Sequence, residues 1–318
     1  MTDSLSNIPS YSGDRAASDT PAIRKLQLSD IGVALRKGFD DFIDLPSHAV
    51  VLCVIYPVIG VMLARMVLGY SVTPLLFPLA AGFALIGPFA AIGLYEMSRR
   101  RELGEDASAW HAFGILRSPS LGAILGLGAL LLALFVTWIA AAQSIYIATF
   151  GNAPAATIPD FLGRVFTTPE GWMLIGVGCG VGFLFALLSL CLSIVSFPMM
   201  LDRHASAADA MVTSLRVVAA NPLVVAAWGF VVAALLVIGT LPFFLGLAVV
   251  VPVLGHATWH LYRMAVAHTD SPPQAPPPKT RHSAADFPVA LFPWVRDGRL
   301  FEAIARRSDE TAALSSNQ

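Results

Sequence analysis

The chain has 318 residues, of which 56% are hydrophobic and 13% are charged, and its net charge is −1. Soluble domains carry about 25% charged residues, so this composition excludes a soluble fold and predicts an all-α, polytopic membrane protein whose main partner is the lipid bilayer. The near-neutral charge also excludes a global positive field that would attract nucleic acid.

The two ends of the chain differ in composition from the middle. Residues 1–29 are polar throughout, which predicts a disordered N-terminal tail without a cleavable signal peptide. Residues 30–264 form the predicted membrane domain. Residues 265–318 form a Pro-rich, mostly disordered C-terminal tail. Within this tail, residues 287–307 either dock on the bilayer or a partner, or form a weakly helical patch.

Six apolar stretches are long enough to cross a bilayer core of about 30 Å, which takes about 20 helical residues. They are residues 47–68, 74–96, 120–148, 171–198, 222–240 and 241–263. The last two form one apolar run, which we divide at the Gly-Thr-Leu-Pro sequence of residues 239–242, because Gly followed by Pro is typical of a turn. The sequence therefore predicts six transmembrane helices arranged as three hairpins.

Lysines and arginines near the ends of these stretches predict the orientation. Most of them lie in segments that share a side with the termini, whereas Arg65 and Arg164 lie on the opposite side. Cytosolic loops carry the excess of positive charge. We therefore expect a multi-pass protein of the cytoplasmic (inner) membrane with both termini in the cytosol.

An amphipathic segment that ends in proline precedes each odd-numbered span. The three segments are residues 30–46, 106–119 and 207–222. Their apolar faces consist of Ile31, Leu35, Phe39, Phe42 and Ile43, then Trp110, Phe113 and Leu116, then Met211, Leu215 and Val218. Such a helix would lie in the headgroup plane with its apolar face toward the hydrocarbon. The shared plan indicates an internal repeat, and the alternative is an ordinary lead-in to each membrane helix.

The outer loop at residues 149–170 contains two local signals. Residues 158–166 predict a short surface helix, and the Thr-Thr-Pro-Glu-Gly sequence at 167–171 predicts the start of span four. Proline is favoured at the first helical position, and a carboxylate there meets the positive end of the helix dipole.

Small residues and prolines predict how the spans pack. Spans three and four carry pairs of glycines four residues apart, which let helix backbones approach closely, either with each other or with a second copy of the chain. These glycines are Gly122, Gly126, Gly176, Gly178, Gly180 and Gly182. Prolines inside the spans predict kinks. They are Pro57, Pro88, Pro198 and Pro252.

Four polar residues near the cytosolic ends of spans two and six form a candidate polar layer: Glu96, His256, His260 and Arg263. The histidines share one helical face, and Glu96 is expected to meet Arg263 or a histidine at the same depth. Three interpretations remain open. The residues are interface anchors with interhelical hydrogen bonds, a polar site for transport or proton movement, or ligands of a metal or haem. No carboxylate or thiol lies at ligand spacing beside the histidines, so no metal or cofactor is expected.

Three segments resemble a family of predicted bacterial integral membrane proteins, domain of unknown function 2189. They are residues 78–104, 196–222 and 249–263, and the similarity runs from about residue 25 to 265. The resemblance implies a bacterial multi-pass membrane protein and implies no activity.

No catalytic motif occurs in the sequence, so no enzymatic activity is expected. The favoured function is a non-enzymatic membrane component in assembly, scaffolding or envelope homeostasis, with a membrane-protein partner or a second copy of the chain. The alternative is a permease or carrier for a small molecule or ion, with a polar site near Glu96, His256 and His260.

Overall fold

The computed structural model describes residues 21–45, 75–107, 115–116, 118–152, 158–241 and 245–267. This part of the chain is helical, with one isolated β-bridge between Ile23 and Val266 and no strand, which confirms the all-α prediction. The helices are α1 (Leu28–Asp44), α3 (Leu76–Ala90), α4 (Ile92–Glu102), α6 (Leu121–Phe150), α7 (Ile158–Thr167), α8 (Pro169–Ser193), α9 (Ser196–Arg203), α10 (Ala207–Ala220), α11 (Pro222–Thr240) and α12 (Leu247–Ala265).

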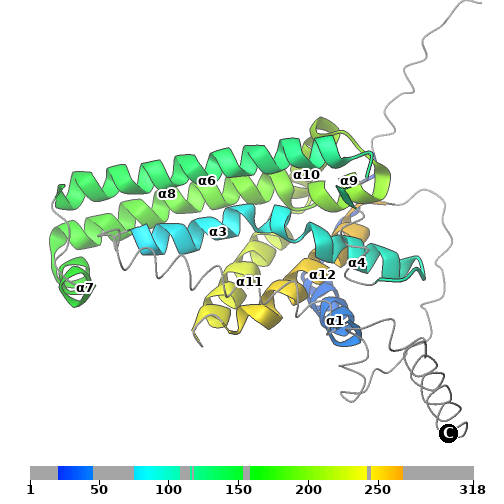
Figure 1. The fold of residues 1–318 in the computed structure, drawn as a ribbon, viewed down its shortest axis with the longest axis horizontal. Coiled ribbons are helices and arrows are strands. Elements are labelled where there is room, and N and C mark those ends of the chain that lie inside the picture. Colours follow the sequence, from blue (N-terminus) through cyan, green and yellow to red (C-terminus); the bar gives the residue numbers. More distant parts are fainter. Residues whose placement is uncertain are drawn as a thin grey trace, which may run out of the picture.

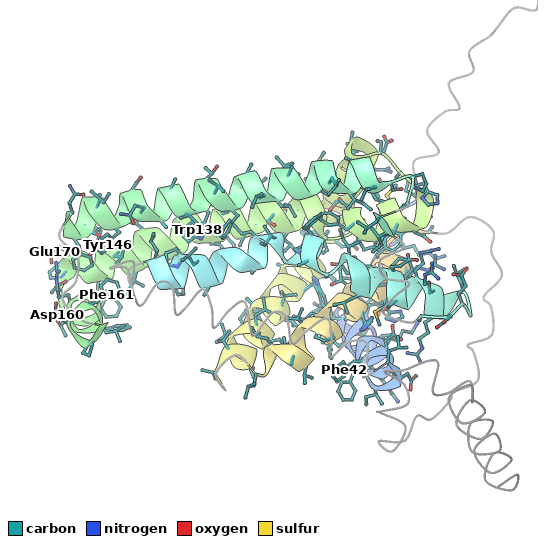
Figure 2. The ribbon with its side chains drawn as sticks, in the orientation of Figure 1. Phe42, Trp138, Tyr146, Asp160, Phe161 and Glu170 are labelled. Atoms are coloured by element: carbon teal, nitrogen blue, oxygen red, sulfur yellow. The ribbon has the colours of Figure 1, made fainter. Side chains whose placement is uncertain are left out.

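Helices α3, α6 and α8 lie side by side as one long bundle (Figure 1). Helix α7 closes one end of the bundle, and α1, α4, α9 and α10 lie toward the other end, with α11 and α12 slanted beside them (Figure 1). Figure 2 shows Tyr146, Phe161 and Glu170 gathered at the α7 end and Phe42 far from them, on α1. Helix α7 and the group of α1, α4, α9 and α10 therefore lie toward opposite ends of the long bundle.

Four helices are long and apolar enough to cross a membrane. They are Phe77–Glu102, Leu121–Phe150, Pro169–Arg203 and Pro222–Thr240, and they correspond to predicted spans two to five. Predicted span one, residues 47–68, lies outside the described residues. Predicted span six falls on α12, which is not among these four, because polar side chains such as His256, His260 and Arg263 lower the apolar character of its second half.

Close packing within the bundle occurs between α3 and α6 at glycines that the sequence analysis did not select. A Cβ at Gly82 would lie 2.7 Å from the ring of Phe135, and a Cβ at Gly128 would lie 2.6 Å from the ring of Phe89. The indole N–H of Trp138 donates to the carbonyl of Pro78 at 2.9 Å. Glycines on both helices therefore shorten the α3–α6 distance.

Within the described ranges, one of the six predicted packing glycines contacts a neighbouring helix. A Cβ at Gly182 of α8 would lie 2.9 Å from the Trp138 indole of α6. Among the residues that the structure describes, a Cβ at the other five would meet no atom of another helix within 4 Å, and these are Gly122, Gly126, Gly176, Gly178 and Gly180. The prediction that these five glycines bring spans three and four together is wrong within one copy of the chain, because α6 and α8 turn other faces toward each other.

Two of the predicted kink prolines lie beside helix breaks. Helix α3 ends at Ala90, shortly after Pro88, and α4 begins at Ile92. Helix α8 ends at Ser193 and α9 begins at Ser196, so Pro198 falls in the first turn of α9, where a missing N–H is tolerated. Pro252 lies inside α12, which is assigned as one helix, and Pro57 lies outside the described residues.

The local signals around helix starts and turns are confirmed. Helix α7 covers the predicted surface helix, and α8 begins at Pro169 with the Thr168 hydroxyl accepting from the N–H of Gly171 at 3.1 Å. Helix α11 ends at Thr240, inside the predicted turn at 239–242. A Cβ at Gly246 would lie 2.8 Å from the Cα of Gly239, so two glycines permit a tight α11–α12 corner.

The ordered domain extends beyond the predicted boundaries at residues 29 and 265. The N–H of Arg24 donates to the carbonyl of Ala265 at 2.9 Å, and the N–H of Ala267 donates to the carbonyl of Ala22 at 2.8 Å. The side chain of Asn221 accepts from the N–H of Leu26 at 2.8 Å. Residues 21–27 are therefore part of the domain rather than of a disordered tail, because their backbone is paired with the end of α12 and with the α10–α11 corner.

Helix α1 packs most closely on α12, through its small residues. A Cβ at Gly38 would lie 2.6 Å from the backbone nitrogen of Ala257 and 2.7 Å from the carbonyl oxygen of Val253. Ile31, Ala34 and Asp41 share this buried face. The absence of a side chain at residue 38 therefore sets the distance between the two helices.

We expect Gly38→Ala to lower the melting temperature of the purified protein in mild detergent. The added methyl group collides with backbone atoms, which cannot rotate away, and such overpacking costs about 1–3 kcal/mol. Gly32→Ala is the matched control, since a Cβ there meets nothing within 4 Å. An unchanged melting temperature for Gly38→Ala would contradict this packing.

Candidate functional site

A buried carboxylate joins α1 to α4 and α12. The side chain of Asp41 is 8% exposed. Its Oδ2 accepts from the Ser98 hydroxyl at 2.7 Å and lies 2.9 Å from Nε2 of His260, and its Oδ1 accepts from Arg101. Arg101 also pairs with Asp44. One residue of α1 therefore binds two residues of α4 and one of α12.

His256 extends this arrangement into the interior. Its side chain is fully buried, and Nδ1 lies 2.7 Å from the Ser98 hydroxyl oxygen. The Ser98 hydroxyl donates its single hydrogen to Asp41, so Nδ1 must carry the proton that His256 donates to Ser98. Nε2 of His256 is buried and has no hydrogen-bond partner among the residues that the structure describes. A second proton there would be unpaired, so the geometry favours neutral imidazole protonated on Nδ1.

The surroundings of Asp41 favour its ionised form. Burial by itself would raise the pKa of the Asp41 carboxyl, but the hydrogen bond and attraction from His260 outweigh that effect, with smaller contributions from His256 and Arg101. The pKa of Asp41 is therefore held below its ordinary value of 3.8. Asp41 is therefore an anion at neutral pH, and donors from α4 and α12 reach both of its carboxylate oxygens.

The remaining predicted residues of the polar layer form separate ion pairs. Glu96 binds Arg99 and Arg100 of its own helix, each at 2.7 Å. Arg263 pairs with Glu102 at 2.7 Å and lies 3.6 Å from Asp202. The expectation that Glu96 meets Arg263 or a histidine is wrong, because arginines one turn away on α4 reach its carboxylate first.

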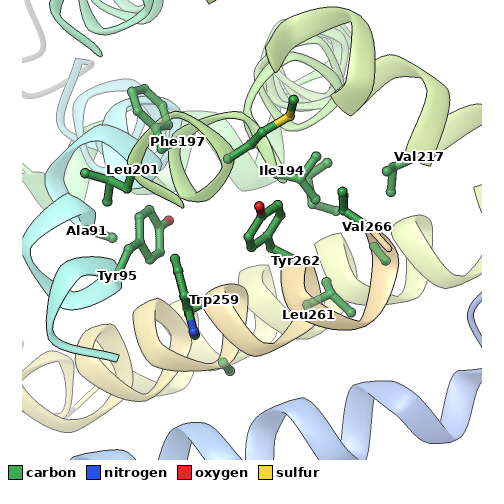
Figure 3. Close-up of a cluster of buried hydrophobic side chains, with 14 of the residues drawn as sticks. Ala91, Tyr95, Ile194, Phe197, Leu201, Val217, Trp259, Leu261, Tyr262 and Val266 are labelled. Carbon is green, nitrogen blue, oxygen red and sulfur yellow. The ribbon is translucent and has the colours of Figure 1, made fainter. Parts of the chain in front are cut away.

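An aromatic cluster lies beside these ion pairs. Figure 3 shows Tyr95 of α4, Phe197 of α9, and Trp259 and Tyr262 of α12 around one buried region. Trp259 donates its indole N–H to Glu102 at 3.0 Å, and the hydroxyl of Tyr262 donates to Asp202 at 2.6 Å. Each of these two aromatic residues buries its ring and places its polar atom on a carboxylate.

The structure thus brings His256 and His260 together with residues that the sequence analysis did not select. These are Asp41, Ser98 and Arg101. Asp41 lies in the first amphipathic segment but outside its predicted apolar face, and its spacing from Ala34 and Gly38 places it on their helical face. That run of small residues was the one signal that this face packs against protein.

The chemistry of the site is hydrogen bonding between helices along the chain Asp41, Ser98 and His256. Nδ1 of His256 lies 4.0 Å from Oδ2 of Asp41, with the Ser98 hydroxyl bonded to both residues. Within the described ranges, no group of three or more His, Cys, Asp or Glu side chains is arranged to hold a metal ion. The arrangement can dock α1 on two other helices and can pass a proton between its members.

Comparison with known families supports the membrane assignment. Residues 76–202 match the model of DUF2189. The family is described as a predicted integral membrane protein. The DUF2189 match runs from α3 to α9, so it includes Ser98 and Arg101, whereas Asp41, His256 and His260 lie outside it. The resemblance seen in the sequence is confirmed for this stretch, which is shorter than residues 25–265. No curated protein and no solved structure matches the chain.

We expect Asp41→Asn to destabilise the docking of α1 strongly at neutral pH. Asparagine has one acceptor oxygen in place of two, so at least one of the donors that Asp41 binds loses its acceptor, which costs about 1–3 kcal/mol for a buried group. Asp44→Asn is the matched control, since that side chain is 26% exposed and its loss costs about 1 kcal/mol or less. The melting temperatures of the two variants in detergent test this difference.

The pH dependence of stability should change in the same variant. Because the folded-state pKa of Asp41 is lowered, its contribution is fully present above the unfolded-state pKa and is lost as pH falls through the folded-state value. The parent protein should therefore lose stability below about pH 4, with a shallower slope in Asp41→Asn. If the melting temperatures of the two proteins fall by the same amount as the pH is lowered over this range, the assignment to Asp41 is contradicted.

Proposed function

We propose that the protein is a six-span, non-enzymatic component of the cytoplasmic membrane that presents a platform of docked helices to the cytosol. The observation that carries this proposal is the buried carboxylate of Asp41, which fixes an amphipathic helix to α4 and α12. A surface helix held so firmly on the membrane domain is suited to positioning a partner. This role is assembly, scaffolding or envelope homeostasis.

The arrangement of α11 and α12 supports an even number of crossings. Helix α11 begins at Pro222, next to Asn221, which binds the segment around Leu26. Helix α12 ends at Ala265, which binds Arg24 in the same segment. If α11 crosses the membrane, the chain must return to its starting side by Ala265. The 19 residues of α12 give about 28 Å of helix, close to the thickness of the hydrocarbon core.

The ends of the interval between α1 and α3 support a further crossing. Asp44, at the end of α1, pairs with Arg101 near the end of α4. Pro78, near the start of α3, lies beside Trp138, which is about 26 Å along α6 from Leu121. Leu45 and Leu75, which bound this interval, therefore lie at different depths along the bundle, as predicted span one requires.

The orientation rests on positive charge. Arg99, Arg100 and Arg101 lie in the last turn of α4, at the same end of the molecule as α1, α9 and α10. Arg164 lies in α7 at the other end. Arginines mark the cytosolic end of bacterial membrane helices. The end that contains the last turn of α4 and both termini of the domain is therefore assigned to the cytosol.

Reporter fusions after residues 71, 110, 155 and 318 test this topology. Alkaline phosphatase is active outside the cytoplasmic membrane, and green fluorescent protein fluoresces inside it. We expect phosphatase activity at 71 and 155 and fluorescence at 110 and 318. An external signal at 110 would reverse the orientation, and opposite signals at 71 and 155 would remove one crossing.

The second candidate function, a carrier for an ion or small molecule, is favoured by the unpartnered Nε2 of His256. An imidazole nitrogen buried without a partner is available to take up a proton or a polar ligand. The scaffold requires His256 only as a donor to Ser98, whereas the carrier requires Nε2 as a base. The two functions therefore differ in what they demand of one atom.

His256→Asn distinguishes the two functions, because asparagine keeps an N–H donor near the position of Nδ1 and has no Nε2 base. If the protein is a scaffold, this variant should retain the parent's cross-linked partners, identified by mass spectrometry, and should complement a deletion strain. Glu96→Gln, on α4, tests the other predicted member of the carrier's polar site in the same assays. Loss of complementation in His256→Asn at normal protein level, with the partners retained, would favour the carrier.

A further inference from the structure

In the three amphipathic segments, buried residues lie in a shared register, at the same distances in sequence before the proline that ends each segment. Ala34, Ala107 and Ala210 lie twelve residues before Pro46, Pro119 and Pro222 respectively, and their exposures are 0%, 8% and 0%. The three alanines were not part of any predicted apolar face. Their equivalence supports a structural repeat rather than three unrelated lead-in helices.

The register continues through α1 and α10, whose side chains are described along the whole helix. Gly38 and Ser214 are both buried eight residues before the proline, and Asp41 and Val217 are both buried five residues before it. Together with the alanines they form what we call the inner faces. These faces are built largely from small side chains and pack against the rest of the protein.

The large apolar side chains follow one position after each inner-face residue. They form what we call the outer faces, which consist of Leu35, Phe39 and Phe42 in α1 and Met211, Leu215 and Val218 in α10. One residue corresponds to about 100° around a helix, so the two faces lie side by side. Phe39 is 48% exposed and Leu215 is 46% exposed. The middle residue of each outer face is therefore exposed, whereas Leu35, Met211 and Val218 are partly buried at the edge of the hydrophobic core.

We propose that the outer faces of α1 and α10 lie in the boundary between headgroups and acyl chains of the anionic leaflet, so that both helices bind the phospholipid surface. This inference rests on the proposed function for its choice of the cytosolic leaflet. Two further observations identify lipid as the occupant of these faces.

The first observation is the direct passage from α10 into a membrane-spanning helix. Asn221 ends α10, and Pro222 starts α11, which is long and apolar enough to cross the bilayer. The last turn of α10 therefore lies at the membrane boundary, where an outward-facing apolar surface meets lipid rather than bulk water. The same register relative to Pro46 gives α1 the equivalent position.

The second observation is the distribution of charge on α1. Arg36 is exposed and lies about 60° around the helix from Phe39, at the edge of the outer face, and Lys37 is exposed further round. Cations beside an apolar face can reach lipid phosphates, and each basic residue near an anionic surface adds attraction. Helix α1 thus carries a protein-facing side, a lipid-facing side and a polar side.

Lipid quenching of a site-specific fluorophore tests the proposal in the full chain. Cys53, Cys179 and Cys191 are first replaced by alanine, and single cysteines labelled with bimane are placed at Phe39→Cys or Leu215→Cys. Asp40→Cys and Arg216→Cys are the controls, since these exposed residues are equivalent to each other in the register and follow the outer faces. Each protein is reconstituted in nanodiscs of phosphatidylcholine, with or without phosphatidylglycerol.

Dibrominated phosphatidylcholine should quench bimane at residues 39 and 215 several-fold more than at 40 and 216, and aqueous acrylamide should show the reverse order. Equal acrylamide quenching at all four positions would overturn the proposal. Protection from both quenchers at 39 and 215, with disulfide cross-linking between copies, would overturn it in favour of a second copy of the chain. Gel filtration before labelling excludes misfolded variants.

The charge part of the proposal is tested separately. Phosphatidylglycerol should increase lipid quenching at residue 39, and Arg36→Gln with Lys37→Gln should abolish that increase. No effect of phosphatidylglycerol in the parent would overturn the preference for an anionic surface. Because lipid quenching does not depend on which side of the membrane the helices occupy, failure of the fusion experiment and failure of this one are distinguishable.

Discussion

The end of the molecule where α1, α4 and α12 meet depends on the interactions of the Asp41 carboxylate. An isolated charge in a protein interior is costly, and it becomes tolerable only when several donors surround it. Here the donors come from two different helices, Ser98 and Arg101 on α4 and His260 on α12. The cost of burying the charge therefore specifies which three helices must meet, and Gly38 specifies how closely α1 and α12 do so.

This polar core differs in character from the long bundle. Helices α3, α6 and α8 approach through glycines and aromatic rings, with few side-chain hydrogen bonds between them, such as that of Ser189 to the carbonyl of Leu85. Many of their large apolar residues, among them Phe183 and Leu184, are exposed, as expected for a surface that faces lipid. The molecule therefore has two regions. The long bundle is held by close apolar packing, and the end around Asp41 is held by ion pairs and hydrogen bonds.

Features set by neighbouring residues could be predicted from the sequence, and features set by distant contacts could not. The start of α8 depends on Thr168, Pro169 and Glu170 alone, and the α11–α12 corner depends on a short run around Gly239. The partners of Glu96 required knowledge of which of several nearby arginines reaches it. In α1 two adjacent faces were both suitable for burial, and only the position of α12 decided that the small face packs against the protein.

The contact between α1 and α12 also has a consequence for synthesis. Asp41 and His260 are 219 residues apart, so at translation rates of about 5–20 residues per second the ribosome needs roughly 10–45 s to supply the second after the first. During that interval the nascent α1 has neither α4 nor α12 beside it at first, and Asp41 must stay hydrated. If α1 binds the bilayer surface before α12 is synthesised, its large apolar side chains are not exposed to chaperones and proteases. The docking of α1 on α12 can then take place only after α12 has been synthesised.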